Sequence, residues 1–405
     1  MSRVADDLAR LVAIPSVTGA ERAVQDEVAG LLADAGLEVE RVEPDLASLV
    51  ADPEFPGMEV PRTDLPLVAG RLTTGRPGPR ILLIAHCDVV PAGGSWTSPP
   101  FEPVIRDGLL YGRGACDMKG GMVSALEAIR RLDRDAIVGE VVFVSVPAEE
   151  DGGAGTFAAI RSGFVGDMAV ITEPTDLEVV VAHGGAITFR LTVPGRAAHA
   201  SQRLEGVSAL DNLTYLLEAL RADEQIRNEA ETHPLMKAIG LPYPTMVGKV
   251  AGGNWPSTVM DEVVAEGRYG VRLGQDGFGA ADDLRSAIGR AWESHDFLSA
   301  FPVGVEVWGG RFDSAQVPID HPLPVGLAAA AEAITGVRPA LVGVPYGADM
   351  RLMVNQGKTP TVMYGPGDVR VAHAADEYVS LDEVETCARV LTAWLTETLS
   401  GRPVA

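Results

Sequence analysis

The stretch that decides the fold is "ILLIAHCDVVP", residues Ile81 to Pro91. Its first five residues carry no charge and are typical of a buried strand. The strand then ends in His86 and Asp88, which alternation along a strand points to the same side. A single pair of this kind is common and often marks a satisfied core histidine beside a loop aspartate. The pair becomes informative only if other strands of the chain end in the same way.

Composition narrows the class of protein. The chain has 405 residues, which is long for one compact domain and predicts two. An apolar content of 46% with 22% charged residues is typical of a soluble globular protein. The formal net charge of −23 argues against nucleic acid and anionic membranes as partners, because both would repel the chain.

Cysteine usage and the N-terminus predict a cytoplasmic location. Three cysteines, Cys87, Cys116 and Cys387, make no disulfide framework and fit a reducing compartment. The start, "MSRVADDLARLVAIPS", has the pattern of an amphipathic helix and lacks the basic and apolar segments of a signal peptide. No apolar stretch reaches the length needed to span a membrane.

Most of the chain alternates between strand and helix patterns. Apolar runs predict strands at 80–86, 140–147, 168–172, 339–344 and 360–364. Helical patterns lie at about 20–36, 118–133, 154–162, 324–335 and 381–399. The Pro-rich residues 45–66 are predicted as a surface loop. This alternation predicts an α/β fold built on a largely parallel central sheet.

The middle of the chain has a different pattern. From "GAITFRLTVPGRAAHAS" (185–201) onward, polar and apolar residues alternate, as in half-exposed antiparallel strands. Helical patterns at about 206–222 and 280–294, with the strands around them, give the order β-α-β-β-α-β. We therefore predict a smaller α+β domain at 187–312, inserted between residues 1–186 and 313–405 of the larger domain.

Other predicted strands do end in side chains of the same kind. "GLLYGRGACDMKGG" places Asp117 in a Gly-rich turn before a helix, and "VVFVSVPAEEDGGAG" ends in Glu149 and Glu150. "MAVITEP" ends in Glu173, and "VMYGPGDVRVAHAADE" places His373 shortly after a strand. Ligands of open α/β sheets bind at the carboxyl ends of strands. We therefore expect these residues to meet in one site.

A mixed set of histidines and carboxylates predicts a metal centre. Zinc and related transition metals prefer such a set, whereas calcium and magnesium prefer oxygen ligands alone. Unpaired buried carboxylates are costly unless cations offset their charge. Five such ligands exceed what one open catalytic zinc needs. They suit two ions that share a bridging carboxylate and lie about 3.5–4 Å apart.

The sequence resembles the M20 metallopeptidase and amidohydrolase family along nearly its whole length. The matching motifs run in family order: "HCDVVP", "GRGACDMKGG", "PAEEDGGAG", "TEP", "GRAAHAS", "GGNWPSTVMDEVVAEGR", "YGADMR" and "GPGDVRVAHAADEYV". The family includes acetylornithine deacetylases, succinyl-diaminopimelate desuccinylases, aminoacylases and glutamate carboxypeptidases. The resemblance implies a di-metal catalytic domain interrupted by a lid that dimerises, which agrees with the change of pattern near residue 187.

The resemblance implies a role for each strand-end residue. His86, Asp117 and Glu173 would hold one zinc ion. Asp117, Glu150 and His373 would hold the second, so that Asp117 bridges the two; Co²⁺ or Mn²⁺ could substitute for zinc. Asp88 would accept a hydrogen bond from the far ring nitrogen of His86 and fix its tautomer. These roles would explain why the opening strand ends in His-Cys-Asp.

Two further residues would act in catalysis. Glu149 would be the general base that deprotonates the attacking water and passes the proton to the leaving amine. Ala148 replaces the more common aspartate before this pair, a departure that removes no ligand. His199 would reach the site of a partner subunit and stabilise the oxyanion, a contribution of about 2.7–4 kcal/mol to the barrier. The alternative is a solvated loop histidine, which the motif around His199 disfavours.

The resemblance also points to residues that would contact the substrate. Asn254 and an arginine of the following strand would belong to the lid, and both Arg268 and Arg272 fall near the family position. Arg351 would hold a substrate carboxylate by bidentate pairing. The "GPG" turn, which ends at Gly367, would do so through backbone N–H groups.

The favoured function is a di-zinc amidohydrolase that removes a small acyl group from an amino acid or a related amine. The motif "GGNWPSTVMDEVVAEGR" is most similar to the acetylornithine deacetylase and desuccinylase branch. The alternatives are a dipeptidase or carboxypeptidase of the same fold and an N-formyl-aminopyrimidine deformylase. A non-catalytic binding module is disfavoured, because the ligand set, the base and the lid histidine are all present. The resemblance also implies a homodimer through residues 187–312.

Overall fold

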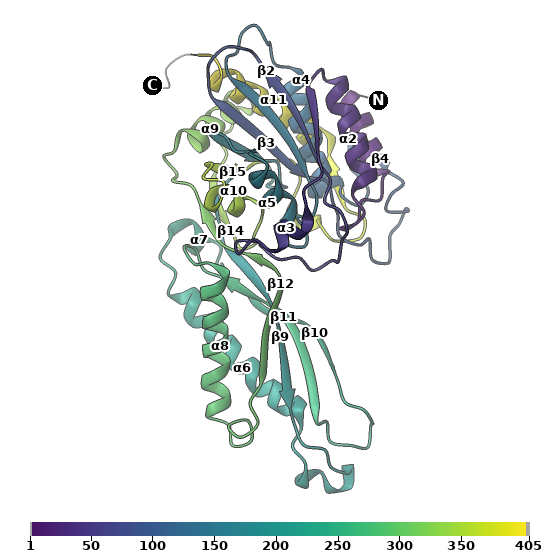
Figure 1. Cartoon of the computed structure of the whole chain (residues 1–405), viewed down its shortest axis with the longest axis vertical. Coiled ribbons are helices and arrows are strands. Elements are labelled where there is room, and N and C mark those ends of the chain that lie inside the picture. The colour runs from purple at the N-terminus through teal and green to yellow at the C-terminus, as the bar shows by residue number, and fades with distance from the viewer. Residues whose placement is uncertain (1, 402–405) are drawn as a thin grey trace. The chain divides into compact units, whose positions relative to one another are not determined.

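Residues 2–401 are described by a computed structural model, in which the chain divides into two compact units (Figure 1). The first unit comprises the described residues up to Val181, together with Gln316–Val342 and those from Ala348 onward. The second comprises Ala182–Ala315 and the short segment Gly343–Gly347. The sequence predicts the change of domain at 187 and 312, a few residues inside these limits. No pattern in the sequence indicates that the downstream segment belongs with the second unit.

The centre of the first unit is a set of parallel strands. β6 (Glu140–Val146), β3 (Arg80–His86), β7 (Met168–Ile171) and β15 (Thr361–Met363) lie side by side in that order. Their side chains are almost all buried. Burial on both faces explains why these strands appear in the sequence as continuous apolar runs. The predicted fold class, an α/β fold with a parallel centre, is confirmed.

Antiparallel strands extend this sheet on both sides. At one edge β2 (Leu67–Thr73) pairs with β6, and β1 (Glu38–Val42) pairs with β2. At the other edge β8 (Val179–His183) pairs antiparallel with β15. The short strands β13 (Ala315–Gln316) and β14 (Leu341–Val344) continue the sheet there. The sequence did not predict β1, whose side chains are all at least partly exposed and give no apolar run.

Helices pack around the sheet, and all but α3 and α10 lie where the sequence predicts a helix. They are α1 (Arg3–Val12), α2 (Arg22–Asp34), α3 (Leu46–Val50), α4 (Gly120–Arg130), α5 (Ala154–Arg161), α9 (Pro322–Thr335), α10 (Met350–Asn355) and α11 (Leu381–Thr398). α11 packs against α4 and α9, and α5 packs against α10. The prediction of an irregular loop at 45–66 was wrong in part. α3 forms there because the Asp45 side chain accepts a hydrogen bond from the Ala47 N–H and caps it.

A small second sheet in the first unit supports the loops near the site. It has the order β16 (Tyr378–Ser380), β5 (Leu109–Tyr111) and β4 (Val104–Arg106). β16 follows the short helix η3 (Val369–Val371) and the loop that carries His373. β5 precedes the irregular turn η1 (Ala115–Lys119), which carries Asp117. Pairing of β16 with β5 therefore joins two segments that are more than 250 residues apart in the chain.

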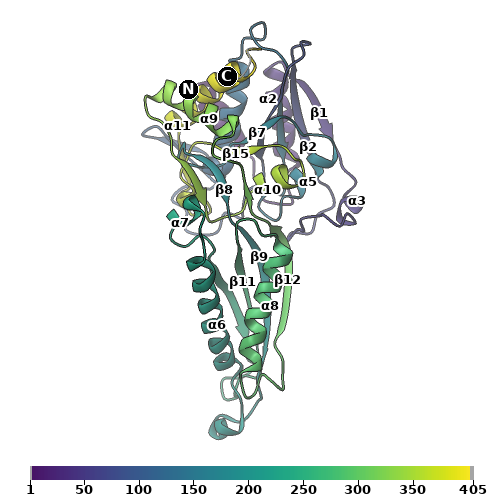
Figure 2. The same ribbon diagram turned by 90° about the vertical axis from the view of Figure 1, so that its left-hand side faces the viewer.

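The second unit is an α+β sandwich of one sheet and two long helices. Its antiparallel sheet has the order β10 (Thr245–Gly252), β11 (Glu262–Val271), β9 (Gly185–Pro194) and β12 (Gly304–Phe312). α6 (Ala209–Glu229) and α8 (Gly277–Glu293) lie on one face and enclose an apolar core with it (Figure 2). Two shorter elements are η2 (Ala200–Glu205) and α7 (Pro234–Ala238). The order of elements agrees with the predicted β-α-β-β-α-β pattern.

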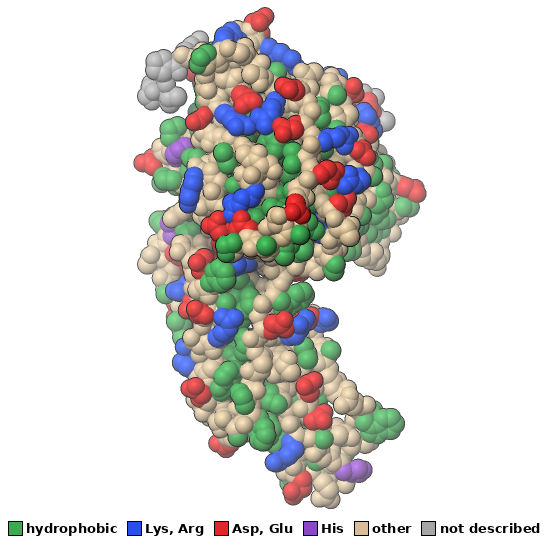
Figure 3. Space-filling view, in the orientation of Figure 1, with side chains coloured by type: hydrophobic (Ala, Val, Ile, Leu, Met, Phe, Trp, Pro, Cys, Tyr) green, Lys and Arg blue, Asp and Glu red, His purple; other side chains and the backbone are tan. Residues whose placement is uncertain are grey.

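Basic side chains on the surface lie among acidic ones. On the face displayed in Figure 3, Lys and Arg side chains lie among Asp and Glu side chains and form no single basic area. Several surface arginines have acidic partners; Arg22, for example, contacts both Glu43 and Asp64. Among residues 2–401, no helix has the length and apolar character that crossing a membrane requires.

Candidate active site

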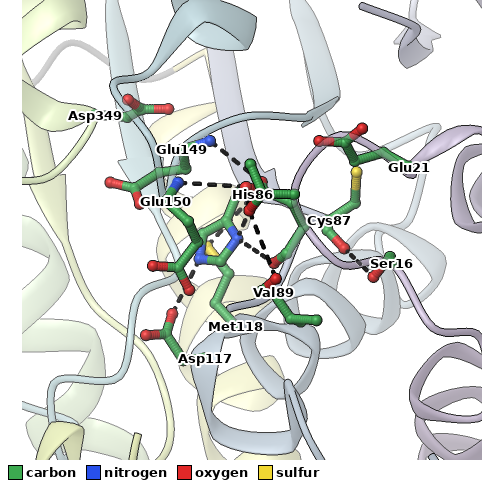
Figure 4. Close-up of polar contacts among 12 residues, drawn as sticks. Ser16, Glu21, His86, Cys87, Val89, Asp117, Met118, Glu149, Glu150 and Asp349 are labelled. Carbon is green, nitrogen blue, oxygen red and sulfur yellow. Dashed lines mark hydrogen bonds and ion pairs between the residues drawn. The ribbon is translucent and has the colours of Figure 1, made fainter. Parts of the chain in front are cut away.

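The predicted ligands gather where the parallel strands of the first unit end. His86 is the last residue of β3, Glu149 and Glu150 follow β6, and Glu173 follows β7. Neighbouring parallel strands end at the same edge of a sheet, so these side chains are brought together without any long connection. Figure 4 shows His86, Glu149 and Glu150 clustered there, with Asp117 facing them from the η1 turn.

His86, Asp117 and Glu150 form the centre of the cluster. Each offers one ligand atom, and these atoms all lie within 4.8 Å of one another. His86 Nε2 is 2.9 Å from Asp117 Oδ1. The side chain of His86 is 1% exposed and that of Glu150 is 9% exposed, so the group is largely shielded from water. The arrangement has the donor types and the spacing that a transition metal ion requires.

Glu173 and His373 lie on opposite sides of Asp117. Glu173 Oε2 is 3.8 Å from His86 Nε2. His373 Nε2 is 3.2 Å from Glu150 Oε1 and 3.5 Å from Asp117 Oδ2. One oxygen of Asp117 therefore faces each histidine. The five side chains thus lie around Asp117, and their assignment to two metal ions stays a prediction.

Asp88 differs in detail from its predicted role. The Nδ1 atom of His86 lies 2.9 Å from the backbone oxygen of Asp88 and 3.6 Å from its carboxylate. The nearer partner of the His86 ring is therefore the main chain. The Asp88 carboxylate instead accepts hydrogen bonds from the backbone N–H groups of Glu149 and Glu150 and from the Thr18 hydroxyl. The Asp88 carboxylate therefore holds the loop that carries both glutamates. The sequence pattern did not reveal this role.

Glu149 is the carboxylate best placed to exchange protons. Its side chain is buried, and within residues 2–401 its carboxylate oxygens have no hydrogen-bond partner. Burial, and then the negative charges of Asp349 and Glu173, raise the pKa of Glu149 well above its usual range. A carboxylate whose protonated form is favoured in this way can accept a proton and hold it near neutral pH.

The charge balance of the cluster fits bound cations. Burial raises the pKa of Glu150 and of Glu173, and neighbouring carboxylates add to the effect. Burial alone would lower the pKa of His86, but Glu173 and Asp117 raise it well above its usual value. Glu173 Oε1 is a buried oxygen without a hydrogen-bond partner, whereas Asp349 Oδ1 lies 3.5 Å from Arg351 Nη1. Acceptors of this kind are stabilised by a cation, so the residues present fit a metal centre.

Arg351 lies in α10 and Gly367 in the loop after β15, and the donor groups of both bind other parts of the protein. The guanidinium of Arg351 is 1% exposed and donates to the backbone oxygens of Ala348 and Gly152. The N–H of Gly367 donates to Glu383, and a Cβ at Gly367 would lie 2.7 Å from Cys116 Sγ. These contacts place both residues as supports of the loops around the cluster.

His199 and Asn254 lie on neighbouring loops of the second unit. His199 is exposed, precedes η2 and lies 2.9 Å from the Ser201 hydroxyl through Nδ1. A β-bridge between His199 and Thr258 brings its loop beside the β10–β11 loop, which holds the exposed Asn254. Both side chains are therefore presented at the same end of the sheet of that unit.

The two candidate arginines have different surroundings. Arg268 lies on β11, and its guanidinium is 5.5 Å from the ring of Phe312. Arg272 follows β11 and forms an ion pair of 3.0 Å with Asp283. Apolar neighbours of Arg268 along the strand, such as Tyr269, point into the core under the helices. Arg268 therefore lies on the face of the sheet that the helices do not cover.

Comparison of the sequence with models of known protein families identifies the family of this chain. A model of peptidase family M20/M25/M40 matches residues 82–397, which is most of the chain. The chain belongs to this family. Its relatives include the acetylornithine deacetylase of Yersinia pseudotuberculosis, 29% identical over 93% of this chain and 92% of the relative. The acetylornithine deacetylase of Salmonella heidelberg is 28% identical over 94% of each chain.

Solved structures of M20 peptidases share the fold. A metallo-carboxypeptidase from Sulfolobus solfataricus superposes with a TM-score of 0.76 at 15% identity, covering 99% of both chains. A dinuclear metal-binding M20 peptidase from Bacillus subtilis gives a TM-score of 0.63 at 15% identity, covering 98% of both chains. Identity this low shows the fold alone. Family membership nevertheless gives the coarse function: this chain is a metal-dependent hydrolase of amide bonds.

Two buried carboxylates near the cluster were not singled out from the sequence. Asp349 is 1% exposed, accepts a 2.5 Å hydrogen bond from Thr156, and shapes the electrostatics around Glu149. Asp349 lies two residues before Arg351 in the quoted motif "YGADMR". A carboxylate in that motif could have been recognised from the sequence as a candidate site residue. Glu377 lies in the last motif, and only the structure shows what it contacts.

Proposed function

We propose that the chain is a two-metal amidohydrolase that removes a small acyl group from an amino acid or a related amine. The observation that carries the proposal is the shared Asp117, which has one oxygen toward each of two histidines while Glu149 stays outside both ligand sets. The acyl substrate is supported by sequence similarity to acetylornithine deacetylases over almost the whole chain. The likeness to the two solved peptidase structures is one of fold only.

The proposed ligand sets follow the two halves of the cluster. His86, Asp117 and Glu173 would hold one zinc-class ion, and Asp117, Glu150 and His373 would hold the other. When bound, two such ions would polarise the amide carbonyl and make water more acidic. The backbone oxygen of Asp88 would fix the tautomer of His86, because it accepts from Nδ1 and leaves Nε2 as the ligand atom.

The remaining steps rest on residues of the chain itself. Glu149 would accept the proton of the attacking water and deliver it to the leaving amine, since its environment favours the protonated form. Asp88 would keep Glu149 in place through the backbone hydrogen bond described above. Arg351 would support the same loop from the other side by holding the Gly152 carbonyl, and it is proposed here as a support rather than as a substrate ligand.

The second unit would supply groups that bind the transition state. His199 would donate to the developing oxyanion, and Asn254 and Arg268 would contact the substrate. Arg268 is preferred to Arg272, because Arg268 lies on β11, on the face of the sheet that the helices do not cover. As the resemblance implies, we propose that the chain forms a homodimer through its second unit and that His199 acts on the partner's site. A cytoplasmic location remains a prediction from composition.

A substrate panel tests the proposed reaction. N-acetyl, N-succinyl and N-formyl amino acids, an N-formyl-aminopyrimidine and a set of dipeptides would be incubated with the enzyme and added zinc or cobalt. We expect an N-acyl amino acid to be cleaved with the highest kcat/KM. A higher kcat/KM for a dipeptide would replace the proposal by a peptidase. Cleavage of the formyl-aminopyrimidine alone would replace it by a deformylase.

Proton release should accompany metal binding. In the metal-free chain, hydrogen bonds to Asp117 and Glu150 raise the pKa of His373 to about 10, so the ring is protonated at neutral pH. A metal ion binds the neutral ring, so binding must release this proton and become tighter as the pH rises. Calorimetry in buffers of different ionisation enthalpy measures the number released.

The His373→Gln variant should release about one proton fewer per chain than the wild type. His233→Gln is the matched control, because His233 lies in the second unit and its side chain makes no capping hydrogen bond. This control should release the wild-type number. Release of the same number of protons by His373→Gln and the wild type would show that metal binding does not displace a proton from His373.

A further inference from the structure

A buried arginine–glutamate pair lies beneath the proposed metal centre. The side chains of Arg113 and Glu377 are each 1% exposed, and Arg113 Nη1 donates to Glu377 Oε2 at 2.6 Å. Arg113 follows β5 and Glu377 precedes β16, so strand pairing brings the two residues together. A fully buried ion pair costs desolvation that its own attraction often fails to offset. Stability alone is therefore a weak reason for its presence.

The glutamate of the pair holds the turn that carries Asp117. Glu377 Oε1 accepts hydrogen bonds from the backbone N–H groups of Cys116 at 2.9 Å and Asp117 at 3.1 Å. The η1 turn departs from helical backbone angles at Asp117 and Met118, and Glu377 holds the backbone N–H groups at this irregular point. Both oxygens of Glu377 are thus engaged, one with Arg113 and one with the backbone of the bridging ligand.

The arginine of the pair holds the loop that carries His373. Arg113 Nη2 donates to the backbone oxygen of His373 at 3.3 Å and to that of Ala92 at 3.1 Å. The His373 side chain is 53% exposed, and its backbone has a positive φ of 61°. An exposed loop residue in the left-handed region needs contacts from outside the loop to keep one orientation. Arg113 supplies such a contact from the buried side.

We propose that Arg113 and Glu377 are positioning residues that fix His373 relative to the carboxylate of Asp117, and so set the affinity of the second metal site. The inference rests on the proposed function, in which Asp117, Glu150 and His373 form that site. The Arg113–Glu377 contact joins the two hydrogen-bond networks from the buried side, so the pair contributes to the spacing of the two ligands. Groups that orient metal ligands typically contribute a factor of about 10–100 to metal affinity.

The experiment separates positioning from stability. In the double variant Arg113→Met with Glu377→Leu, apolar side chains of similar volume replace the ion pair and keep the interior filled, a change that is often neutral for stability. The matched control is Arg130→Met with Asp7→Leu, because Arg130 and Asp7 form another buried ion pair, at 2.5 Å, between α4 and α1. Each metal-free full-length protein would be titrated with Co²⁺, followed by visible absorption and calorimetry, and melted to measure Tm.

The expected result is a Tm close to that of the wild type with a second Co²⁺ bound about 10–100-fold more weakly in the Arg113/Glu377 variant. The affinity for the first Co²⁺ should change less, because two of its proposed ligands, His86 and Glu173, make no contact with the pair. The Arg130/Asp7 control should bind both ions as the wild type does. Wild-type affinity for both ions in the Arg113/Glu377 variant would overturn the proposal.

A milder variant covers the case in which the double variant does not fold. Arg113→Lys keeps a charge for Glu377 but loses the planar fork that reaches the His373 and Ala92 carbonyls. It should fold and show the same selective weakening of the second Co²⁺, whereas unchanged affinity would overturn the proposal. Binding of fewer than two Co²⁺ by the wild type would instead overturn the proposed function, so the two failures are distinguishable.

Discussion

The Glu149→Gln variant is expected to bind two metal ions with wild-type affinity and to lose about 10²–10⁴-fold in kcat. The change removes the group that accepts the proton and keeps the size and shape of the side chain. Glu149 is outside both proposed ligand sets, so the metal centre should be unaffected. The measurement is kcat on the best N-acyl substrate, together with metal content by elemental analysis.

The neighbouring Glu150→Gln variant is the matched contrast. Glu150 Oε1 lies 3.2 Å from the ligand atom of His373, so its loss should weaken the second metal ion as well as activity. The two residues are adjacent in sequence and both buried, so a general disturbance of the loop would affect them alike. Equal loss of metal from both variants would contradict the assignment of Glu149 as a base that binds no metal.

Loss of the His199 side chain should have the second largest effect. An oxyanion donor contributes a factor of about 10²–10³ to kcat, so His199→Ala should lose that much activity and keep its metals. The residue is exposed, and its only described side-chain contact lies within its own loop, with Ser201. Its replacement should therefore leave Tm unchanged. A lowered Tm would indicate a structural role for His199.

A mixture of two inactive variants tests whether His199 acts on the partner's site. One chain of the mixed dimer carries His199→Ala and the other carries Glu149→Gln. If His199 acts across the interface, one site of this dimer has both substitutions and the other site has neither. Activity should then return in the mixed dimer. If His199 acts within its own chain, each site keeps one lesion and the mixture stays inactive. No recovery in a mixed dimer purified with two different tags would refute the shared site.

The parts of the fold that follow from local pattern were predictable. β3, β6, β7 and β15 are buried on both faces, so they appear in the sequence as apolar runs. The polar residues after these runs were informative because parallel strands all end at one edge. From this rule the sequence predicted that four residues lie close together: His86, Glu149, Glu150 and Glu173. The alternating strands of the second unit were recognisable for the opposite reason, since only one of their faces is buried.

Features that depend on distant contacts were not predictable. The Asp88 carboxylate accepts from the backbone of Glu149 and Glu150, 61 and 62 residues away. Arg351 has the side chain that binds a carboxylate, yet in the buried site its partners are two carbonyl oxygens and the Asp349 carboxylate of the protein itself. Arg113 and Glu377 are 264 residues apart and meet only because β5 pairs with β16. A sequence shows which chemistry a side chain carries, but folding decides which partner it meets.

The most direct test of the two-metal account is the metal content of fully active enzyme. Elemental analysis of the purified chain, with kcat measured on the same sample, should find two zinc-class ions per chain. Removal of both ions by a chelator should abolish activity, and stepwise return of zinc or cobalt should restore it, because the buried carboxylates of the cluster need cations. Full activity with one ion or none per chain would contradict the account.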